Sequence, residues 1–478
     1  MEYRWKLLIL TTIGVFMMSL DGSILNIAIY PLSLDLKPPA EVIQWIPIIY
    51  LLVMAITLIG FGRLADLKGK NKFFILGLIV FTLGSLFSAI AWSGEILVFF
   101  RAIQAIGASL IGATSIAMVT EVFPRETGET GKALGINVAG IYLGLVLGPV
   151  LGGFLVQTLT WRSIFYINLP IGIVLIILSH IHIKESENIA KGEKFDPVGT
   201  IIFGIFLASL LLALTLGNTF GWFSIFIIIL FIITIFSFLV FIRIEKNAKY
   251  PMLNLDLFLK NRVFAAANAA ALLNYIATMG VSFWLAIYLQ SIKGLEPIIA
   301  GLLLLPTSLM MAIMSPLTGK YSDKAGSRYI CASGMIIMAI SISILILVLL
   351  FLPIQFILIS QFLLGIGIGL FSSPNQSAIM KSVEKKQLGI ASGTLSTMRV
   401  TGQSISLGLI SAILASFILP SLLNMILSHG TVSLPAEAPI QFLNGLVAAF
   451  ILVIIICIIG ALLSLIRGKE NKYDSILE

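Results

Sequence analysis

Long apolar runs separated by short polar connections occupy most of this chain. The runs are 7–30, 42–62, 73–91, 95–118, 132–157, 163–181, 197–217, 221–242, 264–290, 297–317, 329–350, 354–375, 389–419 and 439–466. Most exceed the ~20 residues that a helix needs to cross the hydrocarbon core of a bilayer. They are continuous, whereas the strands of a membrane β-barrel alternate apolar and polar residues. The pattern therefore predicts fourteen membrane-spanning helices in an all-α integral membrane protein.

Composition and charge agree with this topology. The chain is 59% hydrophobic and 11% charged, whereas soluble domains carry about 25% charged residues. If the N-terminus is cytoplasmic, 25 of the 30 Lys and Arg residues fall on the cytoplasmic side, and only Lys37, Arg162 and Lys293 fall outside. This bias predicts a multi-pass protein of the plasma (inner) membrane with cytoplasmic termini. It also accounts for the net charge of +8 without a nucleic-acid partner.

An internal repeat divides the chain. The segment Gly62-Arg-Leu-Ala-Asp66-Leu-Lys-Gly69 recurs 257 residues later as Gly319-Lys-Tyr-Ser-Asp323-Lys-Ala-Gly326. Further pairs at offsets of 257 or 258 are Gln104 with Gln361, Gly135 with Gly393, and Gly144 with Gly402. The repeat predicts two parallel six-helix halves, 1–183 and 263–478. Residues 184–262 then form cytoplasmic linkers and an inserted two-helix hairpin, expected at the periphery.

Three charges lie alone and deep in the predicted spans: Asp21, Arg101 and Arg399. An ionisable group at the bilayer midplane costs roughly 2.5–3.5 kcal/mol on insertion scales, so such residues are functional candidates. The depths of Asp21 and Arg101 agree within about a helical turn, so the two are expected to meet, either as a coupling pair or as a structural ion pair. Arg399 has no acid in its half, and it is expected to bind helix backbone or an anionic substrate group.

Two motifs suggest moving parts. In the loop after the second helix, Asp66 can oppose the positive end of a neighbouring helix, and Lys70 is expected to pair with Glu121. With Gly62, Gly69 and the repeated Asp323, these residues predict a latch that forms when the cytoplasmic side is closed. The alternative is a basic loop that only sets topology.

The fifth helix carries a glycine at nearly every fourth position. This pattern predicts a smooth face for close helix packing, with a kink at its proline, and it is also common in static packing faces. The residues are Gly144, Gly148, Pro149, Gly152 and Gly153.

In this order, the motifs resemble those of one family. Asp21 and Asn26 close the first helix, Gln44-Trp45 opens the second, and Trp161-Arg-Ser-Ile-Phe-Tyr-Ile-Asn168-Leu-Pro follows the fifth. The set resembles the fourteen-helix drug:proton antiporter family of the major facilitator superfamily. The resemblance spans the whole chain and implies proton-driven export of small lipophilic, cationic or neutral compounds, with Asp21 as the proton or cation site and Arg101 as its partner.

The chain departs from the family pattern in three places. Ala105 stands where a second glycine is usual in the fourth helix, and Thr130 stands where an arginine is usual. The run 297–317 contains no acid, which argues against recognition of dications.

The predicted mechanism is competition between proton and substrate at Asp21 as the two halves rock. The expected cavity wall adds polar side chains that could equally be helix–helix hydrogen bonds. They are Asn26, Gln104, Asn274, Tyr275, Gln361 and Gln403, with Met310, Met311 and Met314 as apolar contacts. The expected partners are a small-molecule substrate, protons and membrane lipids, and the expected state is a monomer with no cofactor.

Two other functions stay open. The first is a proton-coupled or facilitated carrier for a metabolite or organic anion, because Arg101 and Arg399 outnumber the single acid Asp21. The second, a membrane enzyme, would need an intramembrane catalytic constellation. The two cysteines lie in different helices, and the three histidines are too few and too scattered for a metal cluster, so neither an enzyme nor a metal site is expected.

Overall fold

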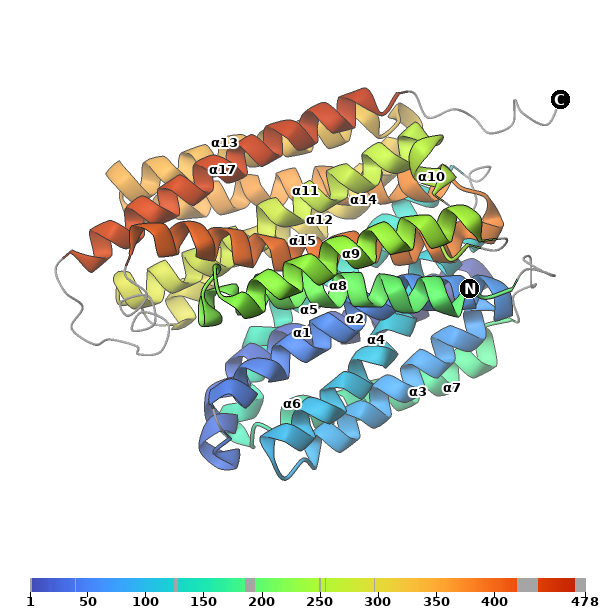
Figure 1. The fold of residues 1–478 in the computed structure, drawn as a ribbon, viewed down its shortest axis with the longest axis horizontal. Helices are drawn as coiled ribbons and strands as arrows, with labels where there is room; N and C mark the ends of the chain where they lie inside the picture. The colour runs from blue at the N-terminus through green and yellow to red at the C-terminus, as the bar shows by residue number, and fades with distance from the viewer. Residues whose placement is uncertain are drawn as a thin grey trace.

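The computed structural model describes residues 2–38, 40–123, 128–184, 194–248, 251–253, 255–295, 297–418 and 437–468. Within these ranges the chain folds into long helices that run side by side along the longest axis of the molecule (Figure 1). Fourteen spans are long and apolar enough to cross a membrane. The helix type and the number of spans predicted from the apolar runs are therefore confirmed.

The first half of the repeat contains six spans. Its elements are α1 (Tyr3–Leu36), α2 (Ala40–Lys68), α3 (Lys70–Ala89), α4 (Gly94–Val122), α5 (Thr130–Thr158), α6 (Ser163–Tyr166) and α7 (Asn168–His182). The predicted run 163–181 divides into the short α6 and the longer α7. Helix α1 packs on α5, and α4 packs on both α2 and α3. This packing gathers α1, α3, α4 and α7 around one interior.

The second half repeats the arrangement. Its long helices are α11 (Arg262–Ile287), α12 (Pro297–Ala325), α13 (Arg328–Phe351), α14 (Ile357–Lys381), α15 (Leu388–Phe417) and α17 (Ala438–Ile466). Short turns flank them: α10 (Asp256–Leu259), η2 (Tyr288–Ile292), η3 (Ile354–Phe356) and η4 (Lys385–Gln387). Helix α14 packs on α12 and α13, as α4 packs on α2 and α3 in the first half.

The two halves meet along two seams, α5 with α12 and α15 with α2 and α4. Glycines allow the backbones to touch at both seams. A Cβ on Gly62 would overlap the carbonyl oxygen of Gly389, and a Cβ on Gly319 would overlap that of Gly131. The repeat therefore places the same motif glycine at a backbone contact between the halves on each seam.

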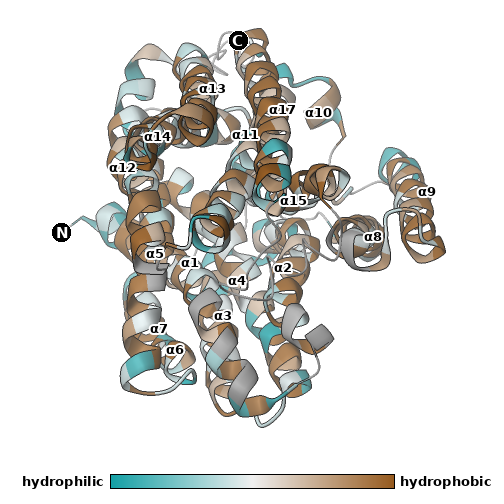
Figure 2. Ribbon diagram, turned by 90° about the vertical axis from the view of Figure 1, so that its left-hand side faces the viewer, coloured by the Kyte–Doolittle hydropathy of each residue, from teal (hydrophilic) through white to brown (hydrophobic). Residues whose placement is uncertain are grey.

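The inserted hairpin consists of α8 (Pro197–Phe220) and α9 (Ile225–Asn247). Asp196 caps α8 by accepting a hydrogen bond from the Gly199 N–H at 2.9 Å. Helix α9 is the outermost helix (Figure 2), but α8 also packs on α2 and α15. A pocket of about 150 Å³ lies between these three helices, lined by Leu52, Leu211 and Ser404 among others. Helix α9 is thus peripheral, as expected for the hairpin, whereas α8 borders the seam between the halves.

Candidate functional site

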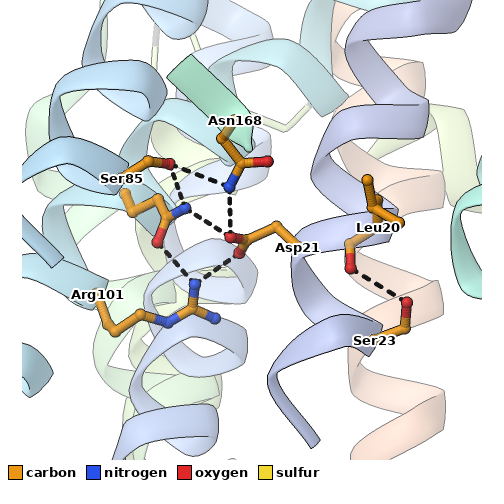
Figure 3. A network of polar contacts seen from close by, with 7 residues as sticks. Leu20, Asp21, Ser23, Ser85, Arg101 and Asn168 are labelled. Carbon is orange, nitrogen blue, oxygen red and sulfur yellow. Dashed lines mark hydrogen bonds and ion pairs between the residues drawn. The ribbon is translucent and has the colours of Figure 1, made fainter. Parts of the chain in front are cut away.

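The carboxylate of Asp21 on α1 is held by three side chains from the first half (Figure 3). Arg101 Nη1 donates to Oδ2 at 2.6 Å, while Gln104 Nε2 and Asn168 Nδ2 both donate to Oδ1 at 2.8 Å. The contact between Asp21 and Arg101 is the one that their predicted depths indicate. Helices α1, α4 and α7 thus bring the carboxylate, the guanidinium and the two amides together.

The donors are themselves connected. Arg101 Nη1 also donates to Gln104 Oε1 at 2.6 Å, which the three-residue spacing on α4 allows. Ser85 Oγ on α3 accepts from Gln104 Nε2 at 2.7 Å and from Asn168 Nδ2 at 3.3 Å. The five residues therefore form one closed polar network, the Asp21 network: Asp21, Ser85, Arg101, Gln104 and Asn168.

Aromatic rings cover the network. The Arg101 guanidinium carbon lies 4.3 Å from the ring centre of Tyr50 and 5.7 Å from that of Phe165. Asp21 and Arg101 are each only 1% exposed. Burial makes the removal of either partner costly, because an unpaired charge would stay in a low-dielectric interior. Protonation of Asp21 would likewise leave the buried Arg101 guanidinium without its negatively charged partner.

Sequence reasoning missed two members of the network. Asn168 lies in the segment after the fifth helix on which the family resemblance partly rests. A polar amide near the start of the sixth predicted helix could have marked it as a candidate site residue. Ser85 lies in an apolar helix among several other serines, and nothing in the sequence distinguishes it. Gln104 belongs to this network and is fully buried, so in this conformation it lies inside its half of the molecule.

The other polar residues expected at the cavity divide into two groups. Asn274 donates to the sulfur atoms of Met335 and Met338 at 3.4 and 3.2 Å, and Gln361 Oε1 accepts from Thr307 at 2.7 Å. Both are about 1% exposed, inside the second half.

Tyr275 and Gln403, by contrast, are partly exposed. Asn26 lies on α1, but its side chain is outside the described residues. The methionines expected at the cavity, Met310, Met311 and Met314, are partly buried on α12.

The latch motif joins the two halves at the end of the bundle where α1 begins. Asp66 accepts from the backbone N–H groups of Gly389 and Ile390 at 2.9 and 3.0 Å, at the start of α15. In the repeat-related contact, Asp323 accepts from Gly131 and Lys132 at 2.8 and 3.2 Å, at the start of α5. Each carboxylate thus faces the positive end of a helix from the opposite half.

Basic residues complete both contacts. Lys70 lies 3.4 Å from Asp66 and 3.3 Å from Glu121, so the predicted pairing with Glu121 is present. Lys381 lies 2.7 Å from Asp323. Gly69 follows α2 with a φ of 106°, and Gly326 follows α12 with a φ of 77°, a region in which side chains are strained.

The glycine face of α5 lies against α1. A Cβ on Gly144 would come within 2.6 Å of the Phe16 carbonyl oxygen, and one on Gly152 within 2.8 Å of the Ile24 side chain. Ser23 Oγ donates to the Gly144 carbonyl at 3.1 Å. Gly148 faces Ser23 directly, Gly153 faces open space, and the side chain of Pro149 is outside the described residues. The motif therefore fixes the segment of α1 that carries Asp21.

At the opposite end of the bundle, Asp35 on α1 accepts from Trp161 Nε1 at 2.8 Å and from Arg162 Nη1 at 2.5 Å. These hydrogen bonds, Trp161 first, lower the pKa of Asp35 below its ordinary value. The contact anchors the far end of α1 to the connection between α5 and α6. Within the described ranges, no group of three or more His, Cys, Asp or Glu side chains could hold a metal ion.

In the part of the chain that the structure describes, fourteen apolar spans, a repeated six-helix unit and a buried charge network define a polytopic membrane protein of the transporter class. The family model of the Major Facilitator Superfamily matches residues 11–198 and 195–407. The chain belongs to this superfamily.

Curated relatives resemble it over most of its length. It is 34% identical to the riboflavin transporter RibZ of Clostridioides difficile (strain 630), covering 88% of this chain and 90% of that one. It is 32% identical to the multidrug resistance protein Stp of Mycobacterium tuberculosis (strain ATCC 25618 / H37Rv), covering 86% and 76%. Among solved structures, the human organic anion transporter MFSD10 shares the fold with a TM-score of 0.68 at 12% identity, covering 97% of this chain and 100% of that one.

Proposed function

We propose that this protein is a proton-coupled antiporter that exports small lipophilic compounds by alternating access. The observation that carries the proposal is the Asp21 network, in which a buried carboxylate is held by Arg101 at 2.6 Å and by two amides. When such a carboxylate is protonated, it loses its charge, and the surrounding side chains must rearrange because Arg101 loses its partner. Relatives that are named multidrug resistance proteins support export of lipophilic compounds.

The proposed cycle uses two sets of contacts, the Asp21 network and the latch contacts of Asp66 and Asp323. With the latch closed, Asp21 takes a proton from the outer side, and its hold on Arg101 weakens. The halves then rock, the contacts of Asp66 and Asp323 break, and the proton leaves to the cytoplasm as substrate binds. The distribution of Lys and Arg supports the cytoplasmic assignment of the latch side. We propose a monomer in the plasma membrane with both termini cytoplasmic, driven by the proton gradient without a cofactor.

A second candidate is a carrier of a metabolite or organic anion. Two observations favour it: the relative named a riboflavin transporter, and a positive charge, Arg399, for which the described residues offer no counter-ion. A carrier of this kind would share the fold and the Asp21 network with the exporter. The two candidates differ in which compounds move and whether a proton gradient drives them.

The test is uphill transport in proteoliposomes under an imposed pH gradient, with ethidium and riboflavin as fluorescent probes. Wild-type protein should concentrate at least one probe against its gradient, and Asp21→Asn should abolish this while leaving folding and insertion intact. Asp35→Asn is the matched control, because Asp35 is also an acid on α1 but its side chain is 48% exposed at the end of the helix. Uphill transport by Asp21→Asn at the wild-type rate would refute the proposal.

A further inference from the structure

Arg399 is a charged residue that the Asp21 network does not use. It lies near the middle of α15, the helix that packs on α2 and α4 of the first half and on α11 of the second. Its side chain is partly exposed. Among the described residues its guanidinium has no hydrogen bond and no ion pair. A guanidinium within a membrane span is costly unless something offsets its charge.

Tyrosines of both halves lie within electrostatic range of this charge. The guanidinium interacts electrostatically with the phenol groups of Tyr50 on α2, Tyr142 on α5 and Tyr275 on α11. Tyr142 Oη shares a hydrogen bond of 2.8 Å with Ser372 on α14. Tyr50 Oη is buried and has no hydrogen-bond partner within the described ranges. Arg399 therefore lies on a helix that contacts both halves, within electrostatic range of three phenol groups.

The helix packing fixes this arrangement. Gly402 lies one turn after Arg399, and a Cβ there would come within 2.8 Å of both the Leu272 carbonyl oxygen and the Tyr275 Cβ. The missing side chain lets α15 approach α11 and brings Tyr275 close to Arg399. Gln403, four residues after Arg399, shares its helix face and is also partly exposed. The amide of Gln403 adds a further donor beside the guanidinium.

The charges in the membrane interior do not balance. Asp21 and Arg101 form a 1:1 pair at 2.6 Å, so their network presents no net negative charge to a ligand. Arg399 is then the deep charge that is left without a counter-ion among the described residues. A ligand that reaches this part of α15 would therefore meet a positive charge close to Tyr275.

We propose that Arg399, with Tyr275 and Gln403, binds the anionic group of the transported compound. The chemistry fits an aromatic carboxylate, because a guanidinium and neutral donors hold the carboxylate while the tyrosine ring contacts the body of the molecule. This inference rests on the proposed transport function and names a substrate class for it. The Tyr50 ring packs against Arg101, and its phenol lies within electrostatic range of Arg399.

The test is calorimetric binding to the purified full-length protein at neutral pH, with 1-naphthoate and its uncharged analogue 1-naphthamide as probes. Wild-type protein should bind the carboxylate more tightly than the amide. Arg399→Gln should lose about tenfold in affinity for 1-naphthoate, because a charge-assisted hydrogen bond is removed, and should keep its affinity for 1-naphthamide. Arg399→Lys retains the charge and should lie between the two.

Lys260→Gln is the matched control, because it removes one positive charge from a side chain that is 76% exposed directly after α10. It should bind both probes as the wild type does. Equal affinity of wild-type protein for the two probes, or an unchanged preference for the carboxylate in Arg399→Gln, would overturn the inference.

This binding assay contains no proton gradient, so its result does not depend on coupling. If Asp21→Asn abolishes uphill transport while Arg399→Gln keeps the carboxylate preference, the proposed function stands and the Arg399 site is wrong. If Arg399→Gln loses the preference while Asp21→Asn still drives uphill transport, the site stands and proton coupling through Asp21 is wrong.

Discussion

At the scale of single residues, the central feature is the Asp21 carboxylate, both of whose oxygens accept hydrogen bonds from side chains. Asp21 accepts from Arg101, Gln104 and Asn168, and Ser85 accepts from the two amides. Each donor is oriented by a second contact, so a change in the charge of Asp21 affects side chains on α3, α4 and α7 together. In the proposed cycle, this arrangement links one proton to the packing of a whole half.

Arg101 is the strongest partner of this carboxylate, and its removal should change the pH at which the proton moves. In Arg101→Ala a positive charge 2.6 Å from the carboxylate is lost while burial stays, so Asp21 should hold its proton to higher pH. Proton release on substrate binding should then occur at higher pH than in wild-type protein. Arg101→Lys should behave between the two. The measurement is a pH titration of substrate-induced proton release, and an unshifted Ala titration would show that the two groups are not coupled.

Much of this site could be predicted from the sequence, because a charge in an apolar run is conspicuous. Asp21, Arg101 and the pairing of Lys70 with Glu121 follow from depth and spacing along helices. The hydrogen-bond partners do not, because Ser85 and Asn168 depend on the angle at which α3 and α7 face α1. Sequence periodicity also could not separate Gln104 and Gln361, which face the interiors of their halves, from Gln403, which is partly exposed.

At the scale of helices, glycines decide where backbones meet. Those of α5 hold α1 in place, and those of the latch motif allow α2 to touch α15. The sequence predicted close packing for both motifs, because glycine-rich helix faces pack closely. It did not predict which helix each face would meet, since that depends on the arrangement of the halves.

Gly62→Ala should destabilise the contact between α2 and α15 without unfolding either helix. The added Cβ would overlap the Gly389 carbonyl oxygen, and overpacking of this kind typically costs about 1–3 kcal/mol. Hydrogen exchange at the amides of Gly389 and Ile390, which bind Asp66, should become faster. Gly301→Ala is the control, because a Cβ there meets no atom within 4 Å. Unchanged exchange in Gly62→Ala would mean that the latch tolerates the side chain.

At the scale of the whole molecule, two similar halves are joined by two similar latches. Asp66 reaches the start of α15 and Asp323 reaches the start of α5, so each half holds the other through a helix end. The repeat in the sequence, read as two parallel halves, agrees with this symmetry. The position of α8 beside α2 and α15 could not be read from the sequence, because the apolar runs 197–217 and 221–242 hold no charged residue that would indicate a neighbour.

The most direct test of the account is proton release from purified protein in weakly buffered detergent solution when a compound shown to bind by calorimetry is added. Wild-type protein should release protons on binding, because in the proposed cycle substrate binding favours the state in which Asp21 is ionised and paired with Arg101. Asp21→Asn should bind the compound and release none, since its side chain cannot ionise. Proton release by Asp21→Asn equal to that of wild-type protein would contradict the assignment of Asp21 as the coupling acid.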